Sequence, residues 1–448
     1  VMHNRAFAPD CVYNKSWFIS EKTLSLPVDP ALFESIMTKA MPFGLKVYEQ
    51  DWICLTHMKM AATQDNVVHA AAWFTALDSA ATRLNLTIQL CMMYSRHVLQ
   101  TVEMDAVTQA RASTDYHPWG KTAECKLGTP NPTCTQWNIG LTSLFYSSLG
   151  IAPSKDNFRT NVTSVPREPN PLLQAIVAGL SGGPVGPSDA IGAMDFTTVH
   201  HIARGPDGYL NKPDAAATPL DLTFTLGFDR FADGLDSLPT VWSAQSEVGG
   251  HAWVYLLAVD LATPIDVGLT DLGLDGSSTA IVFEYFPECW RNATAAARGL
   301  CTFTAGPGHT TVLSPRSTFT LSPGGVRGNG IDNRTGTDGT PFRYVLTAPV
   351  LPSGWVLLGE TGKFFIATRD RIRSIDQAST SALHVVIQGA PLEHVKVECF
   401  APDEVRRIGT AVPGSALHTV VTVCPLSLHG AADLYCEALN CTCSALTV

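Results

Sequence analysis

The first 200 residues alternate short apolar runs with longer segments of helical periodicity. A helix is predicted over residues 30–41, because Asp29 is a good N-cap, Pro30 suits the first helical position and Gly44 follows the end. Further helices are predicted at residues 66–84, 135–150 and 170–183, and strands at 44–52, 86–94, 106–116 and, as a short strand end, 184–189. This alternation indicates parallel strands joined by right-handed crossovers.

Polar clusters follow the predicted strands and never precede them. They are YEQDW, QLCMMYSRH, RASTDYHPW, SKDNF and GGPVGPSD, at residues 48–52, 89–97, 111–119, 154–158 and 182–189. In a (β/α)8 barrel the ends of the strands form the face that carries active sites. We therefore predict that residues 1–204 are the C-terminal part of a (β/α)8 TIM barrel, whose other strands would precede Val1. The alternative is an open doubly wound sheet, but no GxGxxG loop opens a helix here.

The pattern changes after residue 204. A loop rich in Gly, Pro and Asp at residues 205–220 predicts a linker, and beyond it strands of period two dominate. These strands are predicted at residues 222–228, 252–261, 279–286, 317–322, 342–350, 354–360, 363–369, 383–389, 395–400 and 419–424. Short strands separated by turn residues predict an all-β, antiparallel sandwich domain over residues 221–448.

Composition narrows the class of protein. The chain has 448 residues, of which 45% are hydrophobic and 16% charged, as in a globular protein with a large core. The net charge of −10 argues against a nucleic-acid partner, which needs a basic face. No run of 18 apolar residues is present, so no membrane span is predicted. The start at Val1 lacks the features of a signal peptide, which predicts a processed chain or a fragment.

Cysteines and sequons together indicate the secretory pathway. The chain contains 12 cysteines, and N-x-S/T sequons occur at Asn14, Asn85, Asn161, Asn292, Asn333 and Asn440. We therefore expect disulfides, glycans and a secreted, extracellular or lysosomal location. The sequence contains no pair of CxxC motifs, so a zinc site is not predicted. His200 and His201 are adjacent and would not face one another on a helix, so no metal is expected there.

Two carboxylates stand out at predicted strand ends. Asp51 and Asp115 are separated by one predicted strand, so they could face each other across a pocket. A retaining glycosidase needs such a pair, one as nucleophile and one as acid/base, about 5–5.5 Å apart. Asp51 is flanked by Tyr48 and Trp52, aromatic groups suited to packing on sugar faces. Arg111 stands four residues before Asp115, and Trp119 follows it, as well explained by a place in the core as by a contact with sugar. Loop solvation and helix capping are the alternative interpretations of the two carboxylates.

Several segments resemble the motifs of a known family, in the same order. QLCMMYS at residues 89–95 is followed by RASTDYHP at 111–118, APSKDNF at 152–158, LSGGPVGPSDAIG at 180–192 and DGYLNKP at 207–213. They resemble the Cys-Met, Arg-x-Ser-Asp-Asp-Phe-Trp-Pro, Pro-Asp-Trp-Asp-Met-Phe, Ser-Gly-Gly-Pro-x-Tyr-x-Ser-Asp and Asp-Gly-Ser-x-Leu segments of glycoside hydrolase family 36. The similarity is to its raffinose synthase and alkaline α-galactosidase branch, and it covers roughly residues 44–220.

This resemblance implies a barrel with a C-terminal β-domain and retaining chemistry on α-linked sugars. By position, Asp51 matches the nucleophile and Asp115 the second Asp of the Asp-Asp pair, the acid/base. Arg111 would orient Asp115 or the sugar hydroxyls. Asp156 and Asp189 match polar residues near the sugar. Two positions depart from the family: its Lys before the nucleophile is Glu49 here, and the first Asp of its pair is Thr114.

The sequence therefore predicts a retaining α-glycosidase or transglycosylase of the α-galactosidase/raffinose synthase type. The predicted sugar contacts are Trp52, Glu49, Arg111, Asp156, Asp189 and Trp119. The expected partners are an α-linked glycan and a second chain that could supply the missing part of the barrel; no cofactor is expected. The alternatives are a catalytically inactive module that binds glycans or serves an extracellular assembly, and a metal hydrolase that uses His200 and His201.

Overall fold

The computed structural model describes most of the chain, in two compact units. The described residues are 1–113, 115–116, 136–161, 168, 170–225, 240–259, 261, 263–285, 310–323, 342–376, 382–410, 418–437 and 440–446. We call residues 1–115 and 142–156 the N-terminal unit, and residues 116–141 and 157–448 the C-terminal unit. Each unit is described by itself.

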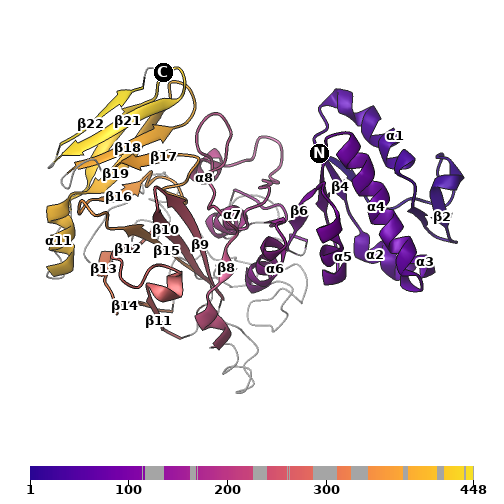
Figure 1. Cartoon of the computed structure of the whole chain (residues 1–448), viewed down its shortest axis with the longest axis horizontal. Coiled ribbons are helices and arrows are strands. Elements are labelled where there is room, and N and C mark those ends of the chain that lie inside the picture. Colours follow the sequence, from indigo (N-terminus) through magenta and orange to yellow (C-terminus); the bar gives the residue numbers. More distant parts are fainter. Residues whose placement is uncertain are drawn as a thin grey trace. The chain divides into compact units, whose positions relative to one another are not determined.

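A five-stranded parallel sheet forms the centre of the N-terminal unit (Figure 1). Its strands, in spatial order, are β1 (Met2–Asn4), β4 (Val47–Gln50), β5 (Thr87–Leu90), β6 (Val107–Arg111) and β7 (Ala152–Ser154). All four neighbouring pairs are parallel. A short antiparallel pair, β2 (Phe18–Ser20) with β3 (Ser25–Pro27), lies outside this sheet.

Helices connect the parallel strands. They are η1 (Lys15–Trp17), α1 (Pro30–Ala40), η2 (Met41–Phe43), α2 (Ile53–Lys59), α3 (Ala61–Gln64), α4 (Val67–Arg83), α5 (Ser95–Gln100), η3 (Thr101–Glu103) and α6 (Gln136–Ser148). As predicted, Asp29 caps α1, accepting a hydrogen bond of 2.8 Å from the Ala31 N–H. Asn66 caps α4 in the same way, through the Val68 N–H.

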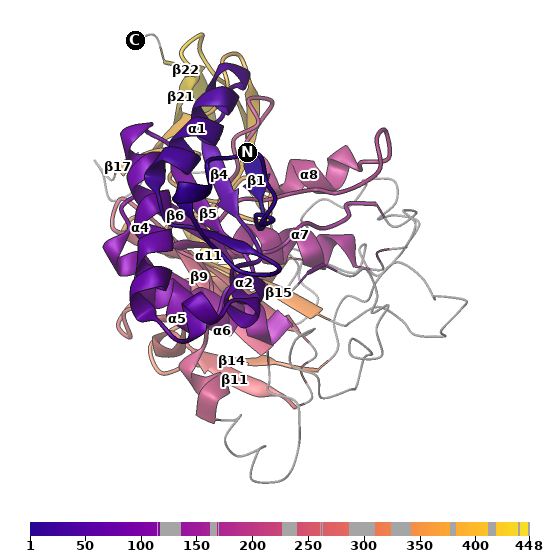
Figure 2. The same ribbon diagram turned by 90° about the vertical axis from the view of Figure 1, so that its right-hand side faces the viewer.

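One face of the parallel sheet is apolar and packs on helices. Tyr48, Ile88, Leu90 and Ala110 are buried with side chains of α1 and α4 in one core cluster. The ring of Tyr48 meets Phe33 of α1 edge to face, with centroids 5.9 Å apart. α1 and α4 lie side by side (Figures 1 and 2). Because strand side chains alternate, the residues between these positions occupy the opposite face.

The C-terminal unit is dominated by antiparallel sheets. Its strands are β8 (Thr218–Pro219), β9 (Thr240–Val248), β10 (His251–Val259), β11 (Ile265–Gly268), β12 (Ala280–Glu284), β13 (Thr310–Leu313), β14 (Thr318–Leu321), β15 (Phe342–Pro349), β16 (Val356–Gly359), β17 (Ile372–Asp376), β18 (Ala382–Gln388), β19 (His394–Phe400), β20 (Val420–Pro425), β21 (Ala431–Glu437) and β22 (Asn440–Ala445). They form sheets in the orders β13-β12-β15-β10-β9-β8, β11-β14, β16-β19-β20 and β17-β18-β21-β22. The helices of this unit include α7 (Pro171–Leu180), α8 (Phe196–Ile202), η6 (Thr270–Leu272) and α11 (Pro402–Thr410).

The protein is therefore a mixed α/β protein, with a parallel sheet followed by antiparallel ones. The described residues show five parallel strands and not a complete eight-stranded barrel. The predicted boundaries at residues 204 and 220 and the sandwich packing stay predictions. The strand end at 184–189 was wrong, since only a single bridge from Pro187 to Phe158 forms there. Residues 221–225 are helical and residues 363–369 form no strand.

Two disulfides join cysteines near the end of the chain. Cys424 pairs with Cys443, and Cys436 with Cys441. Among the described cysteines, four are free: Cys11, Cys54, Cys91 and Cys399. Of the predicted glycosylation sites, Asn14 and Asn85 are exposed, whereas the Asn161 amide donates a hydrogen bond to the Ala193 carbonyl at 3.0 Å. Asn292, Asn333 and the Asn440 side chain lie outside the described residues.

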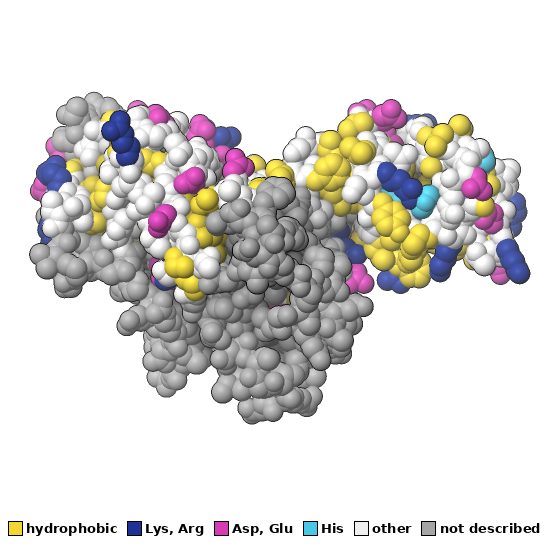
Figure 3. Space-filling view, turned by 90° about the horizontal axis from the view of Figure 1, so that it is seen from below, with side chains coloured by type: hydrophobic (Ala, Val, Ile, Leu, Met, Phe, Trp, Pro, Cys, Tyr) yellow, Lys and Arg dark blue, Asp and Glu magenta, His cyan; other side chains and the backbone are white. Residues whose placement is uncertain are grey.

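Hydrophobic side chains are also found on the surface of the N-terminal unit. In the view of Figure 3 they gather beside basic and histidine side chains. Exposed hydrophobic residues of this unit include Met58 on α2, Tyr94 and Leu99 around α5, and Val102 in η3. Within the described parts of the chain, none of the helices is both long and apolar enough to cross a membrane.

Candidate functional site

The face of the parallel sheet opposite the helices is polar. Across β1, β4, β5 and β6, strand pairing aligns His3, Glu49, Gln89 and Gln109 in one row. Two residues further on, where the strands end, a second row follows. It consists of Arg5, Asp51, Cys91 and Arg111. We call the first set the inner row, the second set the end row, and both together the polar face.

Asp51 is the carboxylate of the end row, with 8% of its side chain exposed. Its Oδ2 lies 3.0 Å from His3 Nε2 and 3.4 Å from Arg5 Nε, and its Oδ1 accepts the Trp52 N–H at 2.7 Å. Burial alone would raise the pKa of Asp51. The hydrogen bonds from the Trp52 amide, His3 and the Cys91 thiol outweigh burial, so the pKa is lowered from its usual value. Asp51 is therefore held as an anion.

Glu49 is a second carboxyl group on the same face, two residues before Asp51. It is half-buried, and burial is the main cause that raises its pKa; the negative charge of Asp51 adds to this. The Cys91 thiol is within hydrogen-bonding reach of both carboxyl groups. Burial, followed by these carboxylates, raises the pKa of Cys91 well above its usual value. Cys91 is therefore a neutral thiol in the end row, not a reactive thiolate.

Arg111 joins two further carboxylates at the end of β6 and β7. Its guanidinium lies 2.7 Å from Asp115 Oδ1 and 3.7 Å from Asp156 Oδ1. Arg111 is largely buried, with 12% of its side chain exposed, whereas the Asp115 side chain is 61% exposed. The Ser113 hydroxyl accepts the Asp156 N–H at 2.8 Å and so ties the two segments together. The predicted residues Asp51, Glu49, Arg111, Asp115 and Asp156 thus belong to strand ends of one sheet.

Trp52 follows Asp51 in a backbone conformation that is unusual for a bulky residue. Its φ is 58°, in the left-handed region, just before α2 begins. The Arg5 guanidinium lies 5.0 Å from the centre of its ring, a cation–π contact. The hydrogen bond from the Trp52 N–H to Asp51 helps to hold this conformation. Backbone strain of this kind is found most often at functional sites.

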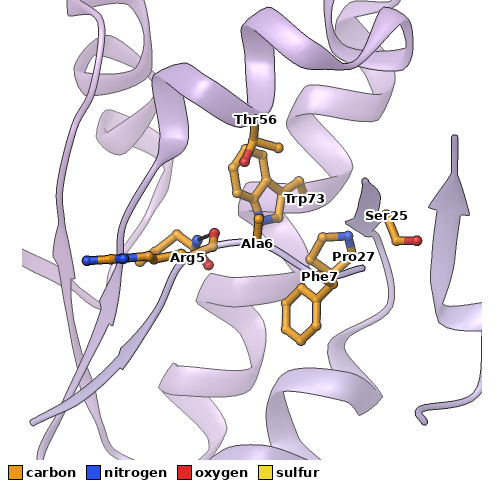
Figure 4. A pocket seen from close by; sticks show the side chains of 8 residues that line it. Arg5, Ala6, Phe7, Ser25, Pro27, Thr56 and Trp73 are labelled. Carbon is orange, nitrogen blue, oxygen red and sulfur yellow. Dashed lines mark hydrogen bonds between the residues drawn. The ribbon is translucent and has the colours of Figure 1, made fainter. Parts of the chain in front are cut away.

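A small cavity lies beside Arg5 of the end row. It is lined by Arg5, Ala6, Phe7, Ser25, Pro27, Gln50, Thr56 and Trp73 (Figure 4). It has room for about one water molecule. Gln50 donates hydrogen bonds of 2.9 Å to the carbonyls of Arg5 and Asp51. The cavity is too small for a sugar, and it is the Gln50 hydrogen bonds that fix the backbone beneath Asp51.

The remaining predicted contacts lie elsewhere or outside the described residues. Asp189, in the C-terminal unit, accepts hydrogen bonds from the N–H groups of Thr160 and Asn161 and from the Thr160 hydroxyl. Its carboxylate therefore holds a loop together. Thr114 and Trp119 lie outside the described residues.

The histidine pair is not arranged as a metal site in the described structure. His200 is in contact with the Nζ of Lys363, at 3.1 Å from Nε2, and the His201 Nδ1 lies 2.7 Å from the Gly362 carbonyl. The described residues hold no group of three or more His, Cys, Asp or Glu side chains placed to bind a metal ion.

Sequence reasoning missed five members of the polar face. They are His3, Arg5, Gln89, Cys91 and Gln109. The spacing of His3 and Arg5, two residues apart, was the available signal, because it is the spacing of one face of a strand. No family model matches the chain, and no curated protein matches it.

Proposed function

We propose that this protein is a retaining α-glycosidase or transglycosylase, with Asp51 as nucleophile and Asp115 as acid/base. The observation that carries the proposal is the enclosed Asp51 carboxylate, which is kept ionised by its hydrogen bonds at a strand end. A second carboxylate, Asp115, stands near the end of β6 on the same edge of the sheet and is oriented by Arg111. The resemblance to glycoside hydrolase family 36 at these positions agrees with the assignment.

In the proposed reaction, Asp115 first takes up a proton from solvent, and it donates this proton to the leaving oxygen while Asp51 attacks the anomeric carbon. A covalent glycosyl ester on Asp51 results. Asp115, now ionised, then removes a proton from water or from a second sugar hydroxyl, which attacks the anomeric carbon and releases Asp51. Arg111 acts as a positioning residue, because its ion pair fixes the direction of the Asp115 side chain.

The spacing of the strands determines how far the side chains of Asp51 and Asp115 must reach for their carboxylates to act on one bond. β4 and β6 are separated by β5, so their backbones are roughly 9–10 Å apart. Side chains that lean over Cys91 would bring the carboxyl groups to the separation that a retaining enzyme needs. We propose that the parallel sheet is part of a (β/α)8 barrel, completed by upstream residues or by a second chain. A secreted or lysosomal location agrees with the two disulfides.

The test is turnover of nitrophenyl α-galactosides and α-glucosides by the wild-type protein, Asp51→Asn and Asp115→Asn. Asp51→Asn should lose at least about a thousandfold in kcat, because the amide cannot form the ester. Asp115→Asn should lose less with these activated leaving groups, which need little protonation, and added azide should restore turnover. Activity of Asp51→Asn equal to that of the wild type would exclude the mechanism.

A second candidate function is a non-catalytic glycan-binding module. Glu49 favours it, because an acid replaces the family's cation beside the nucleophile. This candidate predicts no turnover on any reporter glycoside and sugar binding that survives Asp51→Asn. The enzyme predicts turnover that this substitution abolishes, so a single panel of assays distinguishes the two.

A further inference from the structure

The inner row contains two amide side chains that have no hydrogen-bond partner among the described residues. Gln89 on β5 and Gln109 on β6 are paired in register, and both are half-buried. In the described part of the chain, neither side chain takes part in a hydrogen bond or ion pair. Each amide offers one acceptor oxygen and two N–H donors. Two such groups side by side form a surface that can pair with several hydroxyls.

Glu49 continues this surface on the neighbouring strand. It is aligned with Gln89 across β4 and β5, and with His3 across β1 and β4. Its raised pKa lets the carboxyl group keep its proton to a higher pH than an exposed glutamate. A protonated carboxyl group can donate one hydrogen bond and accept others, as the amides do.

The charges of the end row are largely balanced within the protein. Asp51 contacts Arg5 and His3, and Arg111 contacts Asp115 and Asp156. A charged ligand would have to compete with these internal partners for the same charged groups, which reduces what its own charge contributes to binding. Uncharged hydroxyls meet only donors and acceptors.

We infer that Glu49, Gln89 and Gln109 form a specificity-determining subsite, which binds the hydroxyl groups of an uncharged sugar ring through side-chain hydrogen bonds. The subsite deepens the proposed function, since it takes its ligand class from it. It differs from the proposed catalytic pair in residues and role: it selects the ring, while Asp51 and Asp115 act on the bond. Among the described residues the two amides have no hydrogen-bond partner, so both can bind hydroxyl groups.

The experiment measures binding of free monosaccharides to the full-length protein, by calorimetric titration and by saturation-transfer NMR. The probes are galactose and glucose, which are neutral, together with galactosamine, which is cationic, and galacturonate, which is anionic. Gln89→Met and Gln109→Met preserve side-chain length and remove the hydrogen bonds. Gln100→Met, on α5 and outside the polar face, is the matched control. Melting curves check that each variant is folded.

We expect a neutral sugar to bind at least tenfold more tightly than its charged counterparts. Gln89→Met and Gln109→Met should each weaken that binding about three- to tenfold, the usual effect of one or two neutral hydrogen bonds, while Gln100→Met leaves it unchanged. Gln109→Glu is a second variant that keeps the shape; its added negative charge should shift preference toward galactosamine.

Several outcomes would overturn the inference. They are tighter binding of a charged sugar by the wild type, unchanged binding in folded Gln89→Met and Gln109→Met, and binding of no sugar at all. The proposed function fails independently, through absence of turnover on reporter glycosides. Turnover combined with unchanged sugar binding in Gln89→Met and Gln109→Met would refute the subsite alone. Sugar binding that these two variants weaken, without turnover, would refute the enzyme alone.

Discussion

At the scale of single residues, several ionisable groups of this protein are held neutral by burial. His97 at the start of α5 is an example, with 4% exposure. Its Nδ1 accepts the Tyr94 N–H at 3.0 Å, so the ring also serves as a cap for the helix. Burial first, and then the charges of Arg96 and His57, lower the pKa of His97 to about 4. Protonation would both break the cap and place a charge in the core.

The lowered pKa of His97 predicts that the folded protein loses stability in acid over a defined range of pH. Between the unfolded pKa near 6.5 and about 4, the unfolded chain binds a proton at His97 that the folded chain does not. Stability should therefore fall with decreasing pH over this range, by up to about 3 kcal/mol. His97→Asn keeps the acceptor and cannot titrate, so it should flatten this part of a plot of unfolding free energy against pH. The exposed His394→Asn is the control, and equal slopes for His97→Asn and the wild type would contradict the assignment.

At the scale of elements, helix caps contribute to the stability of the fold independently of the pairing in the sheet. Asn66 accepts the Val68 N–H at 2.9 Å and ends the loop before the 17-residue α4. Because α4 covers the apolar face of the parallel sheet, its N-terminus influences the stability of the whole N-terminal unit.

Asn66→Ala should lower the free energy of unfolding by about 1 kcal/mol, since one helix N–H loses its partner. Asn66→Asp should match or exceed the wild type, because a carboxylate also accepts this hydrogen bond and favours the positive end of the helix dipole. The measurement is denaturant unfolding followed by circular dichroism. Equal losses in Ala and Asp variants would mean that the cap does not act through this hydrogen bond.

Local signals predicted these helices, whereas long-range pairing decided much of the rest. Asp29 and Pro30 predicted the start of α1, and helical periodicity predicted α4 and α7. Residues 363–369 carry the apolar run of a strand but form a buried loop, because their backbone N–H and carbonyl groups are hydrogen-bonded to groups other than the backbone of a neighbouring strand. The His201 carbonyl accepts the Phe364 N–H, the Tyr344 hydroxyl donates to the Phe364 carbonyl, and the Tyr255 hydroxyl pairs with Ala367. No window of sequence contains these partners.

The same distinction explains what could be predicted of the candidate site. Asp51 follows β4 and Arg111 ends β6, and apolar runs in the sequence predict both strands, so the sequence places the two residues at one edge of a sheet. Gln89 and Gln109 were not predicted, because their role depends on register between strands about 20 residues apart. β1 escaped prediction because it has only three residues, Met2 to Asn4, two of them polar. Its partner β4 lies more than 40 residues away in the chain.

At the scale of the whole molecule, each unit has its own core, and the C-terminal unit contains an ionic centre within it. Arg371 is fully buried. Its guanidinium meets Glu393 through two hydrogen bonds, of 2.7 and 3.1 Å, and Glu360 at 2.9 Å. It also donates to the carbonyls of Gln388 and Arg204, so one side chain joins four separate segments.

Loss of the Arg371 charge should therefore be among the most destabilising changes in this unit. Arg371→Met leaves two buried carboxylates without their cation, which we expect to cost about 3–5 kcal/mol in the free energy of unfolding. Arg371→Lys should recover little, because an ammonium group cannot make the forked contacts to both carboxylates.

Burial raises the pKa of Glu360 even in the presence of Arg371, so removing the cation should raise it further. The Arg371→Met variant should then regain part of its stability as pH falls and the carboxylates take up protons. Denaturant unfolding at pH 5 and pH 8 measures this, with the exposed Arg406→Met as control. A loss no larger than that of the control, or one independent of pH, would show that the centre does not hold these segments together.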